Sequence, residues 1–560
     1  MAQPPVLEDP RSGYTFRPHE MPLIPGSPAT PDHPRRRRVA YLLIGLFVGL
    51  VGGAQNGFLL ANTPALQGSL SLTPVEAGWL SVSFYASYAC MSMLLLRMRQ
   101  EYGIQPFVRY AMVGLLAANT VQMLELGYGT ELAARAVAGL AASGLSALSI
   151  YYLMQGLPPA ARIGGMVLGT GLSQIAFPLA RAISPTLLVD GGIDRAFEFQ
   201  FALSLLVLGL VTVFRLPPGQ RRETFEWLDV PSTALFVTGV MALVTFLIQG
   251  RIVWWDTPWL GAVLAVAVLG LGGCLLLESR RCNPMLHTRW LSSRAILSLA
   301  ITGAGVRVLV SEQSFGASGL FASLGYANEQ LTGYYWVLTG ASVAGAVLSL
   351  VRLDPKDLTR PILFAILVIA IAAFADTRTG VLSRPNNLYL TQAAIAFAAV
   401  YAMGPVLMQG MVRALAAGPG HVVSFIAIFS LSQTLGGLAG TAGLSALQTI
   451  RLKTHLLDAS ATLTAANPQL AEGLRRAATS AASTVSDPAL RQSLAAGQVS
   501  REAGREAAVL AFNDVFFVIG WLAVIAFVVV LVPWVINRVR GHNPLGKELA
   551  ALQAMTNRSQ

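Results

Sequence analysis

The chain has 560 residues, of which 54% are hydrophobic and only 12% are charged, and its mean hydropathy is positive. A water-soluble protein of this composition would aggregate, so lipid is the expected solvent. The formal net charge of +11 does not indicate nucleic-acid binding, because the basic residues flank apolar stretches and form no single basic face. Cys90, Cys274 and Cys282 lack metal-ligand spacing, which argues against metal or redox chemistry.

Residues 1–38 are polar and rich in proline, and they end in four consecutive arginines, Arg35 to Arg38. This composition predicts a disordered tail followed by a charge anchor. The apolar stretch that comes next is about twenty residues long, which is the length of a retained spanning helix rather than of a cleaved signal peptide.

About fourteen apolar stretches follow in chain order, each near the ~20 residues that a membrane-spanning helix requires. We place them near 40–61, 76–96, 107–126, 132–154, 163–188, 198–215, 230–249, 258–278, 295–320, 331–351, 361–376, 388–409, 422–447 and 511–537. The predicted fold class is therefore an all-α polytopic membrane protein. An even number of spans puts both termini on one side, and that side, which carries most of the basic loop residues, is the expected cytoplasmic one.

Residues 449–510 interrupt this pattern, because they are rich in alanine and too polar to span a membrane. The expected topology places this external segment outside the cytoplasm, where Pro468 and Pro488 predict turns that separate two or three helices. Two interpretations remain open. The segment is either a solvent-exposed helical hairpin without a partner or a docking surface for a periplasmic protein.

Glycines recur every fourth residue in the first span, at Gly45, Gly49, Gly53 and Gly57, and again late in the chain at Gly436 and Gly440. Such spacing allows another helix backbone to approach closely. We expect tight helix packing at these positions, and the pattern also fits helices that slide against one another.

Several short stretches together carry a resemblance to a known family, because they follow its order along the chain. They are residues 62–66 with Gly68 and Leu70, residues 76–79, Arg135 with Gly139, residues 158–160 with Arg162, Gly325 with Tyr326 and Gly333, residues 433–435 with Gly440, and Asn513 with Asp514 and Phe516. On these residues the chain resembles the fourteen-span drug:proton antiporters of the major facilitator superfamily, and among them the EmrB-like inner-membrane components of tripartite efflux pumps.

The resemblance implies a major facilitator fold with two six-helix bundles and two extra transmembrane helices. The expected domains are a cytoplasmic tail at 1–38, an N-terminal bundle at 39–216, a linker with the two extra helices at 217–290, a C-terminal bundle at 291–537 that includes the insertion at 449–510, and a cytoplasmic tail at 538–560. The resemblance also implies that Arg135 and Gly139 act in helix packing and gating, as do the regularly spaced glycines of the first span and those at 436 and 440.

The chain departs from the family where the first span carries Gln55 in place of an acidic residue, since an amide cannot carry a proton. Two other family elements are replaced by residues 181–185 and 100–103. Proton coupling must therefore use another residue.

Gln55, Arg181 and Glu312 lie 17, 19 and 18 residues from the basic anchors Arg38, Arg162 and Arg294, which corresponds to ~26–28 Å of helix. This equal depth predicts one polar layer. We expect a substrate cavity lined by Gln55, Asn56, Gln174, Arg181, Arg307, Ser311 and Gln433. An arginine there would suit an anionic headgroup.

Glu312 is the predicted proton carrier, because burial and a neighbouring arginine act in opposite directions on a carboxyl group. The competing interpretation is a static ion pair with Arg181 or Arg307. The sequence contains no phosphate loop of the GxxxxGK[ST] type, which argues against ATP as the energy source.

The predicted function is proton-coupled efflux of amphipathic or weakly acidic small molecules by alternating access, with a proton gradient and no cofactor, metal or catalytic residue. The alternatives are a proton- or ion-coupled importer of the same superfamily and a membrane-embedded lipid-modifying enzyme. The resemblance implies a periplasmic membrane-fusion adaptor and an outer-membrane channel as partners. The expected location is the bacterial inner membrane, with both termini cytoplasmic.

Overall fold

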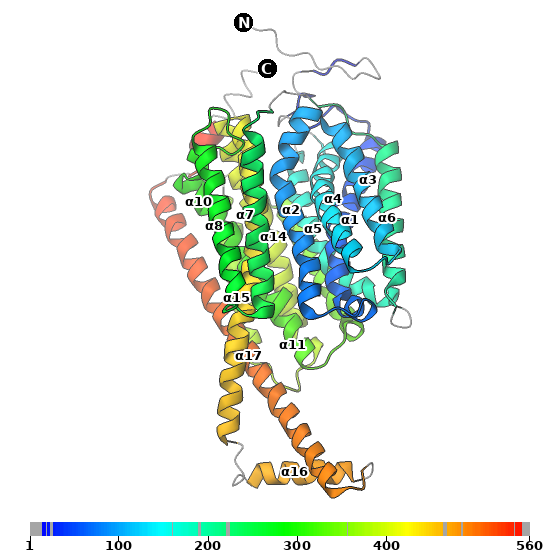
Figure 1. The fold of residues 1–560 in the computed structure, drawn as a ribbon. Coiled ribbons are helices and arrows are strands. Elements are labelled where there is room, and N and C mark those ends of the chain that lie inside the picture. The colour runs from blue at the N-terminus through cyan, green and yellow to red at the C-terminus, as the bar shows by residue number, and fades with distance from the viewer. Residues whose placement is uncertain are drawn as a thin grey trace.

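The protein is an assembly of long, roughly parallel helices, and residues 26–34 and 544–550, near the two ends of the described chain, lie at one end of it, here called the terminal end (Figure 1). The computed structural model describes residues 14–17, 20–22, 26–158, 161–188, 192–219, 225–355, 357–462, 468–482, 485–541 and 544–550. Twelve helices among these residues are long and apolar enough to cross a membrane. The predicted all-α polytopic fold class is thus confirmed.

The first group of helices forms the N-terminal bundle. It consists of α1 Arg35–Ser69, α2 Pro74–Tyr102, α3 Ile104–Met123, α4 Tyr128–Gly156, α5 Gly164–Leu187 and α6 Asp194–Val213. Helices α2 and α3 are not among the twelve apolar spans, but they pack against α4 within the same bundle. Each of the six expected N-terminal spans therefore falls on a helix of this bundle.

The C-terminal bundle contains a rod with a π-helical turn in its middle, followed by five long helices and several short ones. The rod consists of α10 Arg294–Ser311, the π-helix η3 Glu312–Ala317 and α11 Ser318–Ser323. The other elements are η4 Asn328–Leu331, α12 Thr332–Val351, α13 Thr359–Asp376, η5 Pro385–Leu388, α14 Tyr389–Ala417, α15 Pro419–Thr462 and α17 Pro488–Val539.

The two bundles repeat the same pattern of helix contacts. Helix α1 packs on α5 as α10 packs on α15, α2 packs on α4 as α12 packs on α14, and α3 packs on α6 as α13 packs on α17. The bundles meet where α5 contacts α12 and α14 and where α2 contacts α15. This arrangement is that of an internal structural repeat, in which two related halves enclose the space between them.

Glycines make the close contacts within each bundle. A Cβ atom at Gly53 would lie 2.6 Å from the Cβ of Ala176, and one at Gly57 would lie 2.7 Å from the Cβ of Ala180. Helices α1 and α5 can approach this closely only because these positions carry no side chain. The remaining glycines with an expected packing role meet close neighbours as well: Gly45 and Gly49 at Leu153 and Leu172, Gly139 at Phe84, Gly436 at Ala304 and Gly440 at Val308.

Arg135 holds three helices of the N-terminal bundle together. Its side chain is 1% exposed, and its Nε donates to Glu131 Oε1 at 2.8 Å. Its Nη1 donates to the backbone carbonyl of Gln55 on α1 at 3.3 Å, and Gln122 of α3 donates to the same Glu131 oxygen at 2.9 Å. This buried arginine is therefore paired and anchored in the helix packing.

The two extra helices, α7 Asp229–Val253 and α8 Pro258–Ser279, form a hairpin. Helix α7 contacts α2 of one bundle and α15 of the other, whereas α8 packs mainly on α7. A short helix, α9 Thr288–Leu291, leads from the hairpin into the C-terminal bundle. Only one member of the expected extra pair thus lies between the bundles.

An ion-pair cluster joins this hairpin to the N-terminal bundle at the terminal end. Arg281 donates to Asp229 at 2.6 Å, to Glu226 at 2.9 Å and to Glu278 at 2.9 Å. Arg97 of α2 donates to the same Asp229 at 3.0 Å. We call these five residues the hairpin cluster. Because Arg281 and Glu278 are almost fully buried, the cluster is shielded from solvent.

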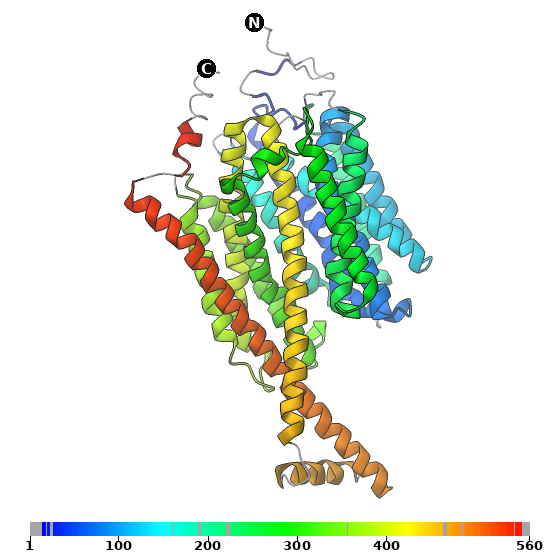
Figure 2. The same ribbon diagram turned by 60° about the vertical axis from the view of Figure 1, so that its left-hand side comes forward.

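The external segment extends far beyond the bundles, at the end opposite the termini (Figures 1 and 2). Helices α15 and α17 continue straight out of the bundle, and α16 Pro468–Ala481 lies across their tips. Asp514 of α17 accepts from Arg451 at 2.6 Å and lies 2.8 Å from His455 Nε2, which ties the two extensions together. Pro468 and Pro488 begin α16 and α17, as the turn prediction requires.

The described part of the N-terminal segment differs from the expected disordered tail. Ala29 and Thr30 are buried, the Ala29 carbonyl accepts from Gln155 of α4 at 2.7 Å, and Asp32 pairs with Arg162 at 2.9 Å. Helix α1 itself begins at Arg35. Hydrogen bonds to the end of the bundle thus order residues whose composition predicted disorder. Residues 1–13 lie outside the described part of the chain.

Candidate functional site: a central cavity and a buried carboxyl pair

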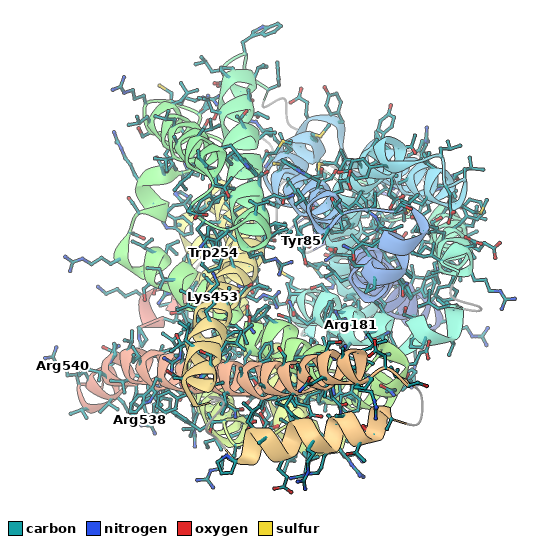
Figure 3. The ribbon with its side chains drawn as sticks, turned by 60° about the horizontal axis from the view of Figure 1, so that its bottom comes forward. Tyr85, Arg181, Trp254, Lys453, Arg538 and Arg540 are labelled. Atoms are coloured by element: carbon teal, nitrogen blue, oxygen red, sulfur yellow. The ribbon has the colours of Figure 1, made fainter. Side chains whose placement is uncertain are left out.

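A cavity of about 500 Å³ lies between the two bundles. Its walls come from α1, α2, α4 and α5 on one side and from α10, η3, α14 and α15 on the other, and α7 closes part of the gap. Figure 3 views the molecule from the external end and labels Tyr85 and Arg181, two of the lining residues. A cavity of this volume accommodates one drug-sized molecule.

Arginine is the only charged residue type in the cavity wall. Arg99, Arg181, Arg251 and Arg307 line it, and no aspartate or glutamate does so among its lining residues. None of the four forms an ion pair with a carboxylate in the described part of the chain. The cavity is therefore electropositive.

Two of these arginines form hydrogen bonds from one bundle to the other. Arg307 of α10 donates from Nη1 to the Gln174 side chain of α5 at 2.5 Å, and its Nε donates to the Gln433 carbonyl at 3.4 Å. Arg181 of α5 donates from Nη1 to the hydroxyl of Tyr335 in α12 at 2.6 Å. A rocking motion of the bundles would have to break or rearrange these bonds.

The cavity wall also contains aromatic rings and unpaired polar atoms. The Arg181 guanidinium lies 5.1 Å from the ring centroid of Phe177, and the Arg99 guanidinium lies 4.9 Å from that of Tyr151. Both polar atoms of the Gln433 side chain are buried without a hydrogen-bond partner among the described residues. Such a wall offers apolar surface for a ligand body and a few polar groups for its orientation.

The structure brings most of the predicted cavity residues together. Six of them line the cavity: Asn56, Gln174, Arg181, Arg307, Ser311 and Gln433. Gln55 does not line it: the residue is 0% exposed, and its backbone carbonyl accepts from Arg135 of α4. The predicted layer of Gln55, Arg181 and Glu312 is also not a contact group. Equal depth fixes how far each residue lies along its helix but not which way its side chain points. Arg181 bonds to Tyr335, whereas Glu312 bonds to Gln392.

Glu312 faces away from the cavity and into the C-terminal bundle. It is 0% exposed, and its Oε1 accepts from Gln392 Nε2 at 2.8 Å. The competing interpretation, a static ion pair with Arg181 or Arg307, is wrong, because those arginines bond to Tyr335 and Gln174 instead. Glu312 begins the π-helical turn η3, whose wider turn changes the angular position of the residues in it. The cavity-lining Ser311, Gln313 and Ser314 surround it in sequence.

Asp376 is the partner that the sequence reasoning missed. The same Gln392 Nε2 donates to Asp376 Oδ2 at 2.8 Å, and Asp376 is 3% exposed. The two carboxyl groups are near enough to interact with each other, while Glu312 Oε2 has no donor among the described residues. We call Glu312, Asp376 and Gln392 the carboxyl site. Its signal in the sequence was an acidic residue at the very end of an apolar stretch.

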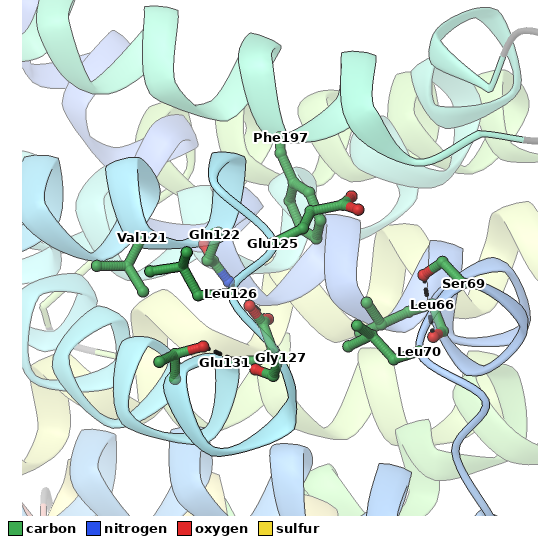
Figure 4. Close-up of a pocket in the computed structure, with 11 residues that line it drawn as sticks. Leu66, Ser69, Leu70, Val121, Gln122, Glu125, Leu126, Gly127, Glu131 and Phe197 are labelled. Carbon is green, nitrogen blue, oxygen red and sulfur yellow. Dashed lines mark hydrogen bonds between the residues drawn. The ribbon is translucent and has the colours of Figure 1, made fainter.

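Arg251 is a second missed residue, since its place at the end of an apolar stretch indicated a loop. It belongs instead to the last turn of α7 and lines the cavity. A second hollow, shown in Figure 4, is lined by Glu125 and Glu131 but measures only about 10 Å³. It has room for no more than about one water molecule, so it is not a substrate site.

These features define a class: a multi-pass membrane protein in which two related helical bundles enclose a central cavity. No protein-family model matches the chain, and no curated protein matches it. Solved transporter structures do match. The human organic anion transporter MFSD10 (TETRAN) has a TM-score of 0.52 at 14% identity, covering 88% of this chain and 100% of that one. The proton:xylose symporter XylE has a TM-score of 0.50 at 13% identity, covering 72% and 88%.

At such identities the likeness establishes the fold alone, and that fold is the one of the major facilitator superfamily. Neither of these two structures is described as an EmrB-like drug:proton antiporter, so the resemblance to that family stays a prediction.

Proposed function

We propose that the protein is a proton-coupled secondary transporter that exports amphipathic or weakly acidic small molecules by alternating access. The observation that carries the proposal is the cavity between the bundles, with hydrogen bonds that cross from one bundle to the other on its walls. A substrate in this cavity contacts both bundles, so its binding energy can favour one arrangement of them over another.

The close helix contacts support a rocking or sliding motion. Helices α1 and α5 meet through glycine and alanine, and in the other bundle Gly436 and Gly440 of α15 let its backbone approach α10 closely. Smooth surfaces of this kind carry few interlocking side chains, so small shifts along them cost little packing energy. The bonds from Arg181 to Tyr335 and from Arg307 to Gln174 would then be made in one arrangement and lost in another.

The carboxyl site is the proposed proton carrier. Two buried carboxyl groups share one amide donor, and neither pairs with a cation among the described residues. Two adjacent carboxylates repel each other in a low-dielectric setting, which favours one shared proton. Because η3 carries Glu312 next to cavity-lining residues, a change at this site reaches the cavity through one short turn of helix.

The energy of one proton is sufficient for useful export. A gradient of ~150 mV supplies ~3.5 kcal/mol per proton, from ~2.3 kcal/mol per 100 mV. That energy supports a substrate gradient of a few hundredfold.

For location and partners, the proposal is a bacterial inner membrane with the terminal end in the cytoplasm. The external segment then points into the periplasm, where it is a docking site for a membrane-fusion adaptor that leads to an outer-membrane channel. Its length and its projection far from the bundles support this role (Figure 2).

An importer of the same superfamily is the alternative, because a fold does not set the direction of transport. The likeness in fold to XylE, a proton:xylose symporter, supports the importer as the second candidate function. An enzyme has less support, since the central cavity contains no histidine or acidic residue among its lining residues.

The test measures accumulation of the weakly acidic amphipathic dye fluorescein in efflux-deficient cells that express wild-type protein or Glu312→Gln, with and without a protonophore. We expect lower dye in wild-type cells, and loss of this difference with either perturbation. Glu198→Gln is a matched control, because Glu198 is exposed at the start of α6, away from the cavity. Raised dye in wild-type cells would establish the importer. Export that survives both the protonophore and Glu312→Gln would overturn proton coupling at Glu312.

A further inference from the structure

Arg251 reaches the central cavity from outside the two six-helix bundles. It lies in the last turn of α7, which packs against α2 and α15, and it lines the cavity beside residues of both bundles. It is the only arginine in the wall that neither bundle supplies. The inserted hairpin is therefore part of the cavity and does more than fill space around it.

Arg251, Arg307 and Tyr85 line the same cavity. Tyr85 is on α2, and its hydroxyl accepts from Asn56 Nδ2 at 2.8 Å. Arg307 makes hydrogen bonds to amide and carbonyl oxygens, while Arg251 forms no ion pair or side-chain hydrogen bond with any described residue. Both guanidinium groups keep donors for a ligand, since each has five N–H groups.

The electrostatic balance of the cavity favours an anion. Four arginines line it and no carboxylate does so among the lining residues, so the wall holds several positive charges that no lining carboxylate offsets. Unpaired charge inside a membrane protein is costly, and a bound carboxylate, sulfonate or phosphate group relieves that cost through charge-assisted hydrogen bonds. A cationic amphipath would instead add to the repulsion.

The rest of the wall suits an apolar body. Tyr85, Tyr88, Phe177 and Phe429 line the same cavity, and aromatic faces pack well against planar rings. The volume of about 500 Å³ admits a molecule with one or two rings and an acidic group.

We propose that the substrates are organic anions with an aromatic or aliphatic body, and that Arg251 of the inserted helix acts with Arg307 to bind the anionic group. The inserted hairpin is then a specificity-determining element of the transporter. This inference rests on the proposed transport function and narrows its substrate class from amphipaths and weak acids to molecules that carry the negative charge when they bind.

The probe pair is 2-naphthalenesulfonate and 2-naphthol, which share a ring system but differ in charge at neutral pH. Equilibrium binding of the radiolabelled compounds to purified full-length protein in detergent measures affinity without requiring transport. We expect the sulfonate to bind wild-type protein at least about tenfold more tightly than the neutral naphthol.

Arg251→Gln should weaken sulfonate binding by about tenfold or more and leave 2-naphthol binding unchanged, because only the anion uses the guanidinium. Arg251→Lys should fall between, since lysine keeps the charge but loses the planar pair of donors. Arg280→Gln is the matched control: it removes one arginine from the same hairpin at an exposed position outside the cavity.

Equal affinity of wild-type protein for the two probes would overturn the anion proposal, and this measurement does not depend on how any variant folds. Wild-type sulfonate affinity in Arg251→Gln would overturn the role of the inserted helix. Flux of the sulfonate into proteoliposomes under an imposed proton gradient tests the proposed function separately. Specific binding without proton-driven flux would contradict that function and leave the anion site standing.

Discussion

Asp376 and Glu312 share one amide donor in a site from which solvent is excluded, and this sharing predicts that each carboxyl is necessary for coupling. Asp376→Asn and Glu312→Gln should each lower proton-driven flux in proteoliposomes by about tenfold or more, the usual scale for loss of a proton-transfer group. Substrate affinity should change little, because neither residue lines the cavity. Full proton-driven flux in Asp376→Asn would contradict the shared-proton proposal.

The cavity residues show how far single positions can be predicted. Arg307 and Ser311 were both expected to line the cavity and do so, because residues four apart in a helix share a face. Glu312 was placed by its depth along the helix alone, and depth does not say which way a side chain faces; it accepts from Gln392 of α14 and faces the C-terminal bundle. Asp376 was missed because Glu312, the carboxyl with which it interacts, lies more than sixty residues away in the chain.

At the scale of helices, the contact between α1 and α5 gives a paired prediction. Gly53→Ala would place a Cβ 2.6 Å from the Cβ of Ala176 and 3.1 Å from the Cα of Ser173, so the helices must separate. Overpacking of this kind costs about 1–3 kcal/mol. Gly68→Ala, in the same helix, meets nothing within 4 Å and should be neutral or stabilising by up to about 1 kcal/mol.

Thermal unfolding of both purified variants in detergent checks this pair. The midpoint for Gly53→Ala should fall below that of wild type, and the midpoint for Gly68→Ala should equal or exceed it. Equal midpoints for the two variants would mean that α1 and α5 can part without loss of packing.

The hairpin cluster predicts a larger effect. Arg281 binds three carboxylates, of which those of Glu278 and Asp229 are 0% and 5% exposed. Arg281→Gln leaves these buried charges without their main cation, which costs roughly 3 kcal/mol or more. The unfolding midpoint of Arg281→Gln should therefore fall well below that of Arg280→Gln, whose arginine is exposed. A similar midpoint for both variants would show that Arg97 alone satisfies Asp229.

Glu226 adds a pH dependence to the same cluster. Hydrogen bonds from Asn283 and Arg281 hold the pKa of Glu226 below its usual value. A carboxyl whose pKa is depressed by folding stabilises the protein above the unfolded pKa of about 4.3, and this contribution disappears as the pH falls through the folded value. Unfolding midpoints measured between pH 7 and pH 3 should therefore fall less steeply in Glu226→Gln than in wild type. Parallel curves would contradict this contribution.

The sequence predicted most helices within a few residues, because hydropathy over about twenty residues is a strong signal in a membrane protein. It was weaker at the hairpin of α7 and α8. Hydropathy marks both helices as spans, yet only packing decides that α7 touches both bundles while α8 stays outside. It also failed for residues 26–34, where proline and polar residues suggested disorder but backbone groups find partners on the bundle.

At the scale of the whole molecule, hydropathy and loop charge predicted that both termini share one end, and the described residues 26–34 and 544–550 lie at the same end of the bundles (Figure 1). The alanine-rich composition of the external segment predicted helices outside the membrane. It did not predict that two of them would be continuous with spanning helices, because no glycine or proline signal marks either a break or a continuation near 447 or 511. The result is a helical projection whose two long helices, α15 and α17, are also spanning helices.

Because α15 and α17 run unbroken from the bundle into the external segment, the segment can be shortened without removing a spanning helix. Deleting residues 455–505 removes α16 and the outer parts of α15 and α17 but keeps Arg451 and Asp514, which pair at 2.6 Å at the base of the projection. Since the cavity and the carboxyl site lie within the bundles, flux into proteoliposomes should stay near the wild-type value. Drug resistance of intact cells should be lost, because the proposed adaptor has no surface to bind. Resistance that persists would contradict the docking role, whereas loss of flux in proteoliposomes would show that the projection takes part in the transport cycle itself.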